Sequence, residues 1–201
     1  MNVLGRTKYA LGTAVGRPRR ERFLTAFPRH GVGVELGVFR GGFTTKLLRW
    51  ARPRELHLVD GWWEIYGECF PDWGAYSEFG RLSTRAAYEE ARDAVKRFDA
   101  QCTFHVGDDL EVLHGFPDEF FDWVYLDTTH EYGHTRDELE ILRMKVKPSG
   151  VIAGDDWHED PAHLHHGVCR AVREFCDRYG WELRDLDSFG QWLVAPADAA
   201  G

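Results

Sequence analysis

The sequence has no long hydrophobic run. None of its apolar stretches approaches the roughly 18–20 consecutive residues that a membrane-spanning helix requires. The basic N-terminus, MNVLGRTKYALGTAVGRPRRERF, has no continuous apolar centre and no convincing cleavage site, so we predict no signal peptide. We therefore expect a cytoplasmic protein with no membrane partner.

Cysteine is scarce as well. The four cysteines are Cys69, Cys102, Cys169 and Cys176, and they form neither a CxxC pair nor the spacing of a zinc finger. In a chain of 201 residues this pattern is typical of reduced, mostly buried thiols in a cytoplasmic protein.

Positive charge is in deficit, with 25 basic against 33 acidic residues and a formal net charge of −8. Proteins that bind nucleic acids neutralise phosphates with clustered Lys and Arg. The one basic cluster, residues 17–22, is typical of a solvated helix start. We expect no nucleic-acid partner.

Internal repeats and low-complexity linkers are also absent. A composition of 43% hydrophobic and 29% charged residues is ordinary for a globular protein. We expect a single domain over residues 1–201, with an N-terminal extension and helix over residues 1–30. Apolar residues within 1–16 can pack on a neighbouring copy, so a homo-oligomer is possible.

What the sequence does contain is an alternation of strand-like and helix-like segments, which predicts parallel strands with helical crossovers. Strands are expected at 31–36, 55–59, 102–106, 121–126, 150–154, 181–186 and 190–195. Helices are expected at 43–51, 84–98, 108–114, 131–146 and 168–179. The last two strands are too close in sequence for a crossover helix, so they predict an antiparallel hairpin. The fold class is α/β, a seven-stranded, mostly parallel sheet with helices on both faces.

Residues 61–83 interrupt this alternation with an aromatic-rich insertion. Seven aromatic side chains, among them Trp62, Trp63, Trp73 and Tyr76, lie in a stretch broken by glycine and proline. A long irregular segment inside a domain is usually functional or mobile. It is either a cover packed over the sheet or a lid over a bound acceptor molecule.

A glycine-rich loop joins the first strand to the first helix of the alternation. Gly37 and Gly41 let the backbone turn tightly and approach a ligand. The pattern is ExGxxxG, whereas a dinucleotide loop reads GxGxxG. Glu35, at the end of the strand, would repel a pyrophosphate but suits the ammonium group of an amino-acid moiety.

Acidic residues also follow the next two strands. Asp60 can accept both ribose hydroxyls of a nucleoside in the crevice beyond the strand ends. Asp108 can meet the adenine amino group. Each acid alone is more often a helix cap or a solvated turn, but three in order after a glycine loop favour a nucleoside site.

These segments resemble a known family. VELGVFRGGFT, LHLVDGWWE, HVGDDLEVL, DWVYLDTTHEYGHTRDELE, VKPSGVIAGDDW and GVCRAVREFC are similar, in order, to small metal-dependent O-methyltransferases of class I. This group is related to macrocin O-methyltransferase and, more distantly, to catechol O-methyltransferase. The resemblance implies a Rossmann-like methyltransferase fold and S-adenosylmethionine as cofactor, bound by Glu35, Gly37, Gly41, Asp60, Asp108 and Asp127.

Carboxylates end two neighbouring strands of the expected sheet. Asp127 follows one strand, and Asp155 and Asp156 follow the other. Three clustered carboxylates repel one another unless a cation or protons neutralise them. Oxygen ligands suit Mg²⁺, Ca²⁺ or Mn²⁺ rather than zinc. The similar enzymes hold a divalent metal in this way, so we expect a metal site with Mg²⁺.

Histidines surround the same segment. His130 matches the family position of the general base, and an ordinary imidazole pKa suits proton removal near neutral pH. His130 and His134 also have the spacing of a helical metal pair. His163, His165 and His166 are expected at the surface or in the acceptor pocket, with metal binding as the alternative, and the role of His158 is open.

The expected activity is methyl transfer from S-adenosylmethionine to a hydroxyl of a small molecule, either a sugar-bearing natural product or a catechol-like phenol. Two alternatives are a metal-independent methyltransferase and a protein that binds the cofactor without catalysis. A nicotinamide-dependent dehydrogenase is disfavoured because the GxGxxG loop is absent.

Overall fold

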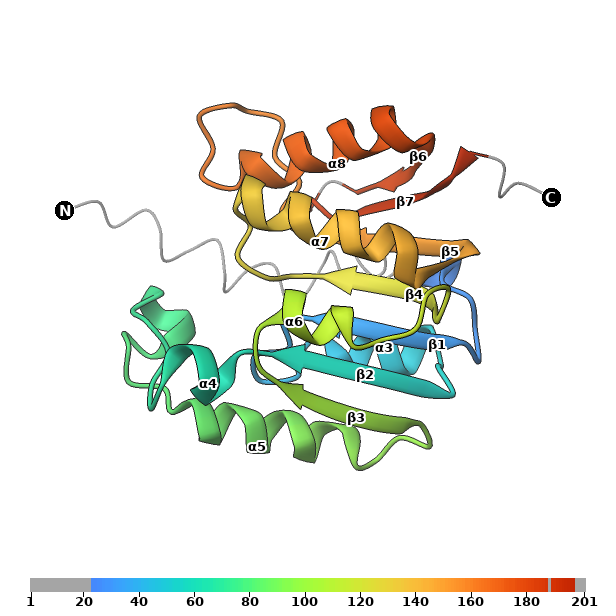
Figure 1. Ribbon diagram of the computed structural model, residues 1–201. Helices are drawn as coiled ribbons and strands as arrows, with labels where there is room; N and C mark the ends of the chain where they lie inside the picture. The colour runs from blue at the N-terminus through green and yellow to red at the C-terminus, as the bar shows by residue number, and fades with distance from the viewer. Residues whose placement is uncertain (1–22, 188, 198–201) are drawn as a thin grey trace.

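One seven-stranded sheet runs through the part of the chain that the structure describes. The computed structural model describes residues 23–187 and 189–197. The strands are β1 Val32–Leu36, β2 Glu55–Asp60, β3 Gln101–Val106, β4 Phe121–Leu126, β5 Val146–Gly154, β6 Trp181–Leu186 and β7 Trp192–Pro196. Their order across the sheet is β3-β2-β1-β4-β5-β7-β6. The strand pairs from β3 to β5 are parallel, whereas β7 runs antiparallel to both β5 and β6 (Figure 1).

The central strand β1 is buried along its whole length, as its apolar sequence VGVEL predicts for a strand covered on both faces. Gly33 has a specific packing role here. A Cβ at this position would lie 2.2 Å from the ring of Trp123 on β4, so only glycine leaves room for the indole. β1 and β4 are therefore closely packed near the start of β1.

Helices cover both faces of the sheet and have bounds close to those expected. They are α3 Thr44–Trp50, α5 Thr84–Val95, α6 Asp109–His114, α7 Tyr132–Lys145 and α8 His166–Tyr179. One core cluster unites the sheet with α7 and α8, and a second unites it with α3, α5 and the 3-10 helix η2 Phe23–Ala26. No helix in the described part of the chain is long and apolar enough to cross a membrane.

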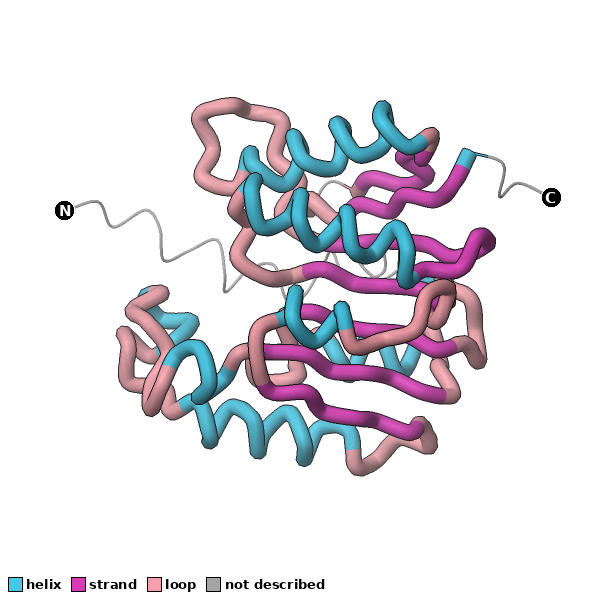
Figure 2. Tube along the Cα trace, viewed as in Figure 1, coloured by secondary structure: helices cyan, strands magenta, loops and turns pink. Residues whose placement is uncertain are grey.

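The insertion of residues 61–83 contains two short elements that the sequence pattern did not predict. They are α4 Trp62–Tyr66 and the 3-10 helix η3 Gly74–Ser77. Loops and these short elements gather at one edge of the sheet, where β1 to β5 end (Figure 2). This edge holds the residues of interest.

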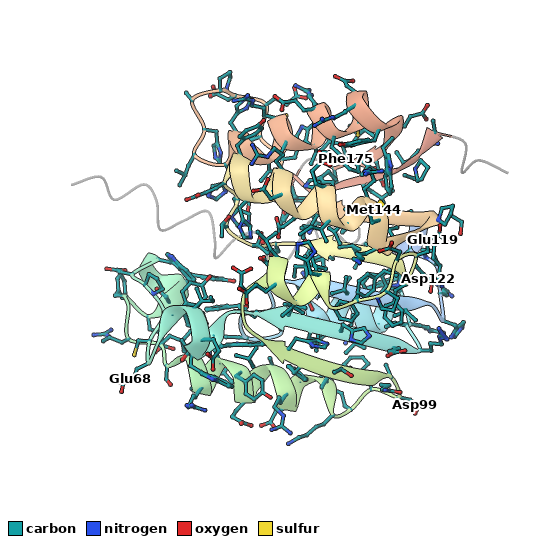
Figure 3. All side chains as sticks on the ribbon, in the orientation of Figure 1. Glu68, Asp99, Glu119, Asp122, Met144 and Phe175 are labelled. Carbon is teal, nitrogen blue, oxygen red and sulfur yellow. The ribbon has the colours of Figure 1, made fainter. Side chains whose placement is uncertain are left out.

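Strand β5 begins earlier than expected, at Val146 rather than residue 150. Its pairing with β4 shifts register between Phe121 and Trp123. A register irregularity lets Pro148 lie within a strand, although proline cannot donate a ladder hydrogen bond. Asp122, labelled in Figure 3, anchors this opposite edge by accepting from Val32 N at 2.7 Å and from Lys147 Nζ at 2.7 Å.

The expected N-terminal helix and the apolar residues proposed for self-association fall mainly on residues 1–22. These lie outside the described residues.

Candidate functional site

Two of the three glycines in the β1–α3 loop, Gly37 and Gly41, are required by packing. Gly37 has a φ of +86°, and a Cβ there would lie 1.9 Å from the carbonyl oxygen of Asp127. Gly41 has a φ of +73°, and a Cβ would lie 2.8 Å from the Cα of Ala91 on α5. Both conformations favour glycine. The loop therefore sits directly against the end of β4 on one side and α5 on the other.

Asp60 holds this loop in place. Its Oδ2 accepts from Val38 N at 2.9 Å and from Phe39 N at 2.7 Å, and its Oδ1 accepts from Trp62 N at 3.1 Å. Burial raises the pKa of Asp60, and the backbone hydrogen bonds partly offset that rise. The residue expected to bind ribose thus also connects the glycine loop to the start of the insertion.

Glu35 is almost completely buried at the end of β1. Its Oε2 accepts from Thr44 Oγ1 at 2.6 Å. Burial raises the pKa of Glu35 well above its ordinary value, although the Thr44 hydrogen bond opposes the rise. A cationic group of a ligand would be a positively charged partner for this carboxylate and would favour its ionised form.

Asp108, expected near adenine, caps α6. Its side chain accepts from Glu111 N at 3.1 Å, which satisfies one of the free amides at the helix start. The next residue, Asp109, was not among the predicted site residues, and its Oδ2 lies 2.9 Å from His134 Nε2. His134 therefore pairs with Asp109 rather than joining His130 in a helical metal pair.

Glu138 lies beside that pair and is fully buried on α7. Its Oε1 accepts from Thr128 Oγ1 at 2.9 Å, and it lies 3.7 Å from His134 Nε2. Burial and the nearby Asp109 carboxylate raise the pKa of Glu138 well above its ordinary value. Glu138 lies in a largely polar helical sequence and does not belong to a periodic pattern of apolar residues. Its burial could therefore not be predicted from the sequence.

His130 lies between two carboxylates at the ends of β4 and β5. Its Nε2 is hydrogen-bonded to Asp127 Oδ1 at 3.0 Å and lies 3.2 Å from Asp156 Oδ2. Burial lowers the pKa of His130, but the Asp127 hydrogen bond and the Asp156 charge outweigh burial, so the pKa is raised. The structure therefore brings together the expected base and two of the three expected metal carboxylates.

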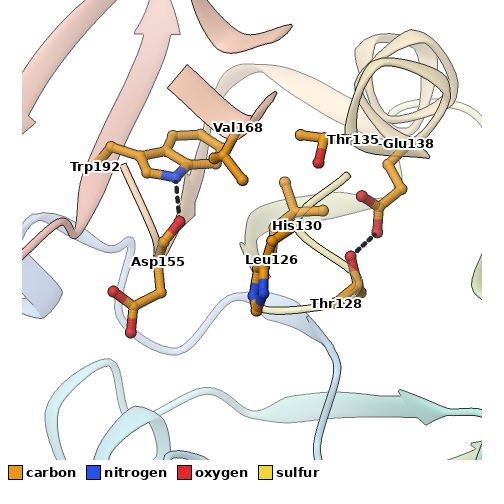
Figure 4. Close-up of a pocket in the computed structure, with 8 residues that line it drawn as sticks. All are labelled: Leu126, Thr128, His130, Thr135, Glu138, Asp155, Val168 and Trp192. Carbon is orange, nitrogen blue, oxygen red and sulfur yellow. Dashed lines mark hydrogen bonds between the residues drawn. The ribbon is translucent and has the colours of Figure 1, made fainter. Parts of the chain in front are cut away.

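The third carboxylate, Asp155, is not among the groups that contact His130 Nε2. Its Oδ1 accepts from Asp156 N at 3.0 Å, and its carbonyl accepts from Trp192 Nε1 at 2.9 Å. Figure 4 shows Asp155, Trp192 and His130 around a cavity of about 10 Å³, which suits about one water molecule. Asp155 is thus tied to β7 through its backbone.

Three groups of histidines and acids in the described residues could hold a metal ion. They are His158 with His163 and His165, His130 with Asp156 and His165, and Asp109 with His134 and Glu138. The combination of Asp127, Asp155 and Asp156 is not one of these groups, so the three-carboxylate site stays a prediction. His158 and His165 lie 3.4 Å and 2.9 Å from Asp156 Oδ1, contacts that the sequence did not predict.

Aromatic side chains of the insertion pack against the glycine loop. Tyr76 stacks on Phe39 with ring centroids 4.2 Å apart, and Phe70 packs edge-on against Phe39 at 5.0 Å. Desolvation and the charges of Asp127 and Asp60 raise the pKa of Tyr76. The insertion therefore reaches over the same strand ends that carry the acids.

A family model described as a methyltransferase domain matches residues 34–157, which run from the glycine loop to the carboxylates after β5. No curated protein matches the sequence.

Solved structures share the fold at low sequence identity. A SAM-dependent methyltransferase from Aquifex aeolicus is 15% identical, with a TM-score of 0.59 over 89% of this chain and 87% of that one. A precorrin 8W decarboxylase from Methanobacterium thermoautotrophicum is 18% identical, with a TM-score of 0.54 over 86% and 83% of the two chains. A spermidine synthase from Thermotoga maritima is 18% identical, with a TM-score of 0.55 over 90% and 59%.

The matched segment covers more than half of the chain. It begins within β1, extends past the end of β5, and includes Glu35, Asp60, Asp127 and Asp156. The strand order and the reversed β7 agree with the fold shared by these structures. The chain belongs to the methyltransferase domain family.

Proposed function

We propose that this protein transfers a methyl group from S-adenosylmethionine to a hydroxyl oxygen of a small molecule, with the help of a divalent metal. The observation that carries the proposal is the Asp127–His130–Asp156 cluster beside the glycine loop. The backbone of Asp127 contacts Gly37, so a ligand on the loop and an acceptor at His130 would be neighbours.

The cofactor would lie along the ends of β1, β2 and β3. Glu35 is a buried carboxylate that suits the ammonium group of the methionine part. Asp60 and Asp108 would face the ribose and the adenine. Both already accept backbone hydrogen bonds, so each would have to use remaining lone pairs for the ligand.

His130 would take the proton from the acceptor. With the Nε2 proton donated to Asp127, Nδ1 is the nitrogen left to act as base. As the acceptor oxygen forms its bond to the methyl carbon, the bond from that carbon to sulfur breaks and S-adenosylhomocysteine leaves. Because the sulfonium is intrinsically reactive, the chain mainly positions oxygen, carbon and sulfur in line.

Of the carboxylates proposed for a divalent metal, Asp156 belongs to a group of donor atoms, with His130 and His165, that all lie within 4.8 Å of one another. Carboxylate and imidazole donors both fit a divalent metal. Asp127, Asp155 and Asp156 are the carboxylates proposed to hold it. A bound divalent metal would supply Lewis-acid polarisation of the acceptor hydroxyl. Tyr76 and Trp73 of the insertion would cover the acceptor and limit water.

The test is a methyl-transfer assay with isotope-labelled S-adenosylmethionine on a panel of catechols, vicinal diols and sugars. Binding of S-adenosylhomocysteine is measured in parallel by calorimetry. Transfer that EDTA abolishes and added metal restores would support the proposal. Transfer unaffected by EDTA would favour a metal-independent methyltransferase, and binding without product on any acceptor would favour a non-catalytic cofactor-binding protein.

A further inference from the structure

A buried hydrogen-bonded network joins α6 and α7 beside the candidate site. Glu138 on α7 is fully buried, and its Oε1 accepts from Thr128 Oγ1 at 2.9 Å (Figure 4). Asp109, the first residue of α6, is hydrogen-bonded to His134 Nε2 at 2.9 Å. The donor atoms of Asp109, His134 and Glu138 all lie within 4.8 Å of one another. Glu138 therefore lies between the loop after β3 and the loop after β4.

The second oxygen of Glu138 gives the observation that needs an explanation. Oε2 is buried, and among the described residues no donor is hydrogen-bonded to it. Buried polar atoms are nearly always hydrogen-bonded in native proteins. A carboxyl oxygen that carries a proton meets this requirement by donating. The Asp109 carboxylate, which is in hydrogen-bonding contact with the Glu138 carboxyl group, is the acceptor within reach.

The charges of the network agree on which acid holds the proton. Burial raises the pKa of Asp109, but the hydrogen bond and the charge of His134 outweigh burial, so that pKa is lowered. Burial, the charge of Asp109 and the hydrogen bond to Asp109 raise the pKa of Glu138 well above its ordinary value. Where the pKa values of two neighbouring acids are displaced in opposite directions, the weaker acid keeps the proton. Asp109 is thus ionised beside His134, and Glu138 is neutral.

We infer that Glu138 is a positioning residue that connects the loops after β3 and β4 by donating to Asp109 and accepting from Thr128. In the loop after β4, Thr128 lies between Asp127 and His130. His130 has a left-handed φ of 60°. Such a conformation persists only where surrounding contacts fix it. The hydrogen bond from Thr128 to the buried Glu138 is a contact of this kind.

Glu138 is also close to both ends of the candidate site in space. Glu138, Thr128 and His130 line one cavity of about 10 Å³, which has room for about one water molecule. A side chain of different shape at position 138 would therefore change the space beside His130. Asp109 follows directly after Asp108, the helix cap that is proposed to face the adenine. One buried side chain thus links the proposed cofactor end of the site to the proposed proton-transfer end.

The catalytic use of this link rests on the proposed function, whereas the fixing of the loops does not. The experiment compares two substitutions at position 138. Glu138→Gln keeps an acceptor oxygen and a donor group, whereas Glu138→Met has a similar size and neither. Thr128→Val removes only the hydrogen bond to Oε1. Leu142→Ala, at a buried position on α7 outside the network, is the control for a general loss of stability.

Hydrogen–deuterium exchange of the full-length chain, measured by mass spectrometry, reports the opening of residues 107–112 and 127–131. We expect exchange in both segments to be at least about 10-fold faster in Glu138→Met and within about 2-fold of the wild type in Glu138→Gln. Thr128→Val should accelerate exchange in residues 127–131, and Leu142→Ala should accelerate neither segment more than the rest of the chain. Circular dichroism establishes that each variant is folded.

Equal protection of the two segments in wild type and a folded Glu138→Met would overturn the proposal. If Glu138→Met does not fold, unchanged protection of residues 127–131 in Thr128→Val would overturn it. Exchange in Glu138→Gln as fast as in Glu138→Met or Thr128→Val would overturn it as well, because the amide keeps both hydrogen bonds.

Methyl transfer provides the second readout. We expect kcat to fall by at least about 10-fold in Glu138→Met and Thr128→Val, with KM for the acceptor within about 3-fold of the wild type, because a displaced base affects the reacting state more than binding. Glu138→Gln should keep kcat within about 3-fold. An unchanged kcat in a variant with faster loop exchange would overturn the positioning role. No transfer by the wild type on any acceptor would refute the proposed function, and the exchange data would still decide whether Glu138 fixes the loops.

Discussion

His130 and Asp156 face each other across 3.2 Å from backbone conformations that are both left-handed, with φ values of 60° and 61°. Such conformations are unfavourable for residues other than glycine, by roughly 1–2 kcal/mol per residue. They persist where the surrounding structure and function require them. At His130 and Asp156, two such residues are in direct contact at the position proposed for proton transfer.

Asp156→Asn tests that relationship. Asparagine tolerates the left-handed conformation, so the free energy of unfolding should stay within about 1 kcal/mol of the wild type. Methyl transfer to the best acceptor of the panel should fall by at least about 100-fold, because the carboxylate that faces His130 is lost. Initial rates and urea denaturation measure the two effects. A variant with normal activity would show that the Asp156 charge has no part in the reaction.

Gly37→Ala and Gly42→Ala form a matched pair in the β1–α3 loop. At Gly37 a Cβ would collide with the Asp127 carbonyl at 1.9 Å, whereas at Gly42 nothing lies within 4 Å. We expect Gly37→Ala to lower the free energy of unfolding by about 2 kcal/mol or more. Gly42→Ala should change it by less than about 1 kcal/mol. Equal losses in urea denaturation would contradict the close approach of the loop to β4.

Asp60→Asn removes a carboxylate that accepts three backbone hydrogen bonds. An amide has only one acceptor oxygen, so we expect a loss of about 2–3 kcal/mol in the free energy of unfolding. Binding of S-adenosylhomocysteine should weaken with it. Unchanged stability would mean that the Val38 and Phe39 amides find other partners.

Asp108→Asn separates capping from cofactor binding. Asparagine and aspartate cap helices about equally well, so stability should change by less than about 0.5 kcal/mol. If Asp108 accepts from the adenine amino group, calorimetry should show weaker binding of S-adenosylhomocysteine by about 10-fold. An unchanged affinity for S-adenosylhomocysteine would mean that Asp108 only caps α6 and does not bind the cofactor.

Much of the fold was predictable because burial leaves a periodic signal. β4 and β6 have the predicted bounds, α3 and α7 are one residue shorter than predicted at each end, and α6 begins one residue later than predicted and ends where predicted. The antiparallel pairing of the last two strands followed from their short connection. The short helix α4 escaped prediction because the packing of Trp62 beneath Tyr88 and Phe104, and not local periodicity, stabilises it.

The candidate site was only partly predictable. Strand-end acids can be located from the sequence, since parallel strands end at one edge. The contacts of His158 and His165 with Asp156 cannot be predicted in this way, because the irregular segment that carries the histidines has no periodic pattern of apolar residues. The pairing of Asp109 with His134 joins residues from two different helices, and only the tertiary structure shows it.

Glu138 gives a prediction for the pH dependence of stability. Its folded-state pKa is raised above the ordinary 4.5, so the folded state holds the proton more tightly than the unfolded state. Stability from this group is therefore complete below that value and decreases as pH rises towards the folded pKa. Glu138→Gln, which resembles the protonated form, should gain stability relative to wild type as pH increases from about 5 to about 8.

Thermal melts across that pH range measure the difference between wild type and variant. Glu89→Gln, at an exposed position on α5, is the control and should show a constant difference. If the difference in thermal stability between wild type and Glu138→Gln does not change with pH, the pKa of Glu138 is the same in the folded and unfolded chains.

The reversal of β7 has a consequence for how the protein is made. Although β7 follows β6 in the sequence, it lies between β5 and β6 in the sheet, and the indole of Trp192 donates a hydrogen bond to the Asp155 carbonyl. In the loop before β7, the Gly190 carbonyl accepts a hydrogen bond from Trp157 N. The ribosome must therefore release the chain at least through β7 before the segment after β5 can take its final form. A nascent chain arrested ahead of residue 190 would carry the glycine loop and lack the finished site.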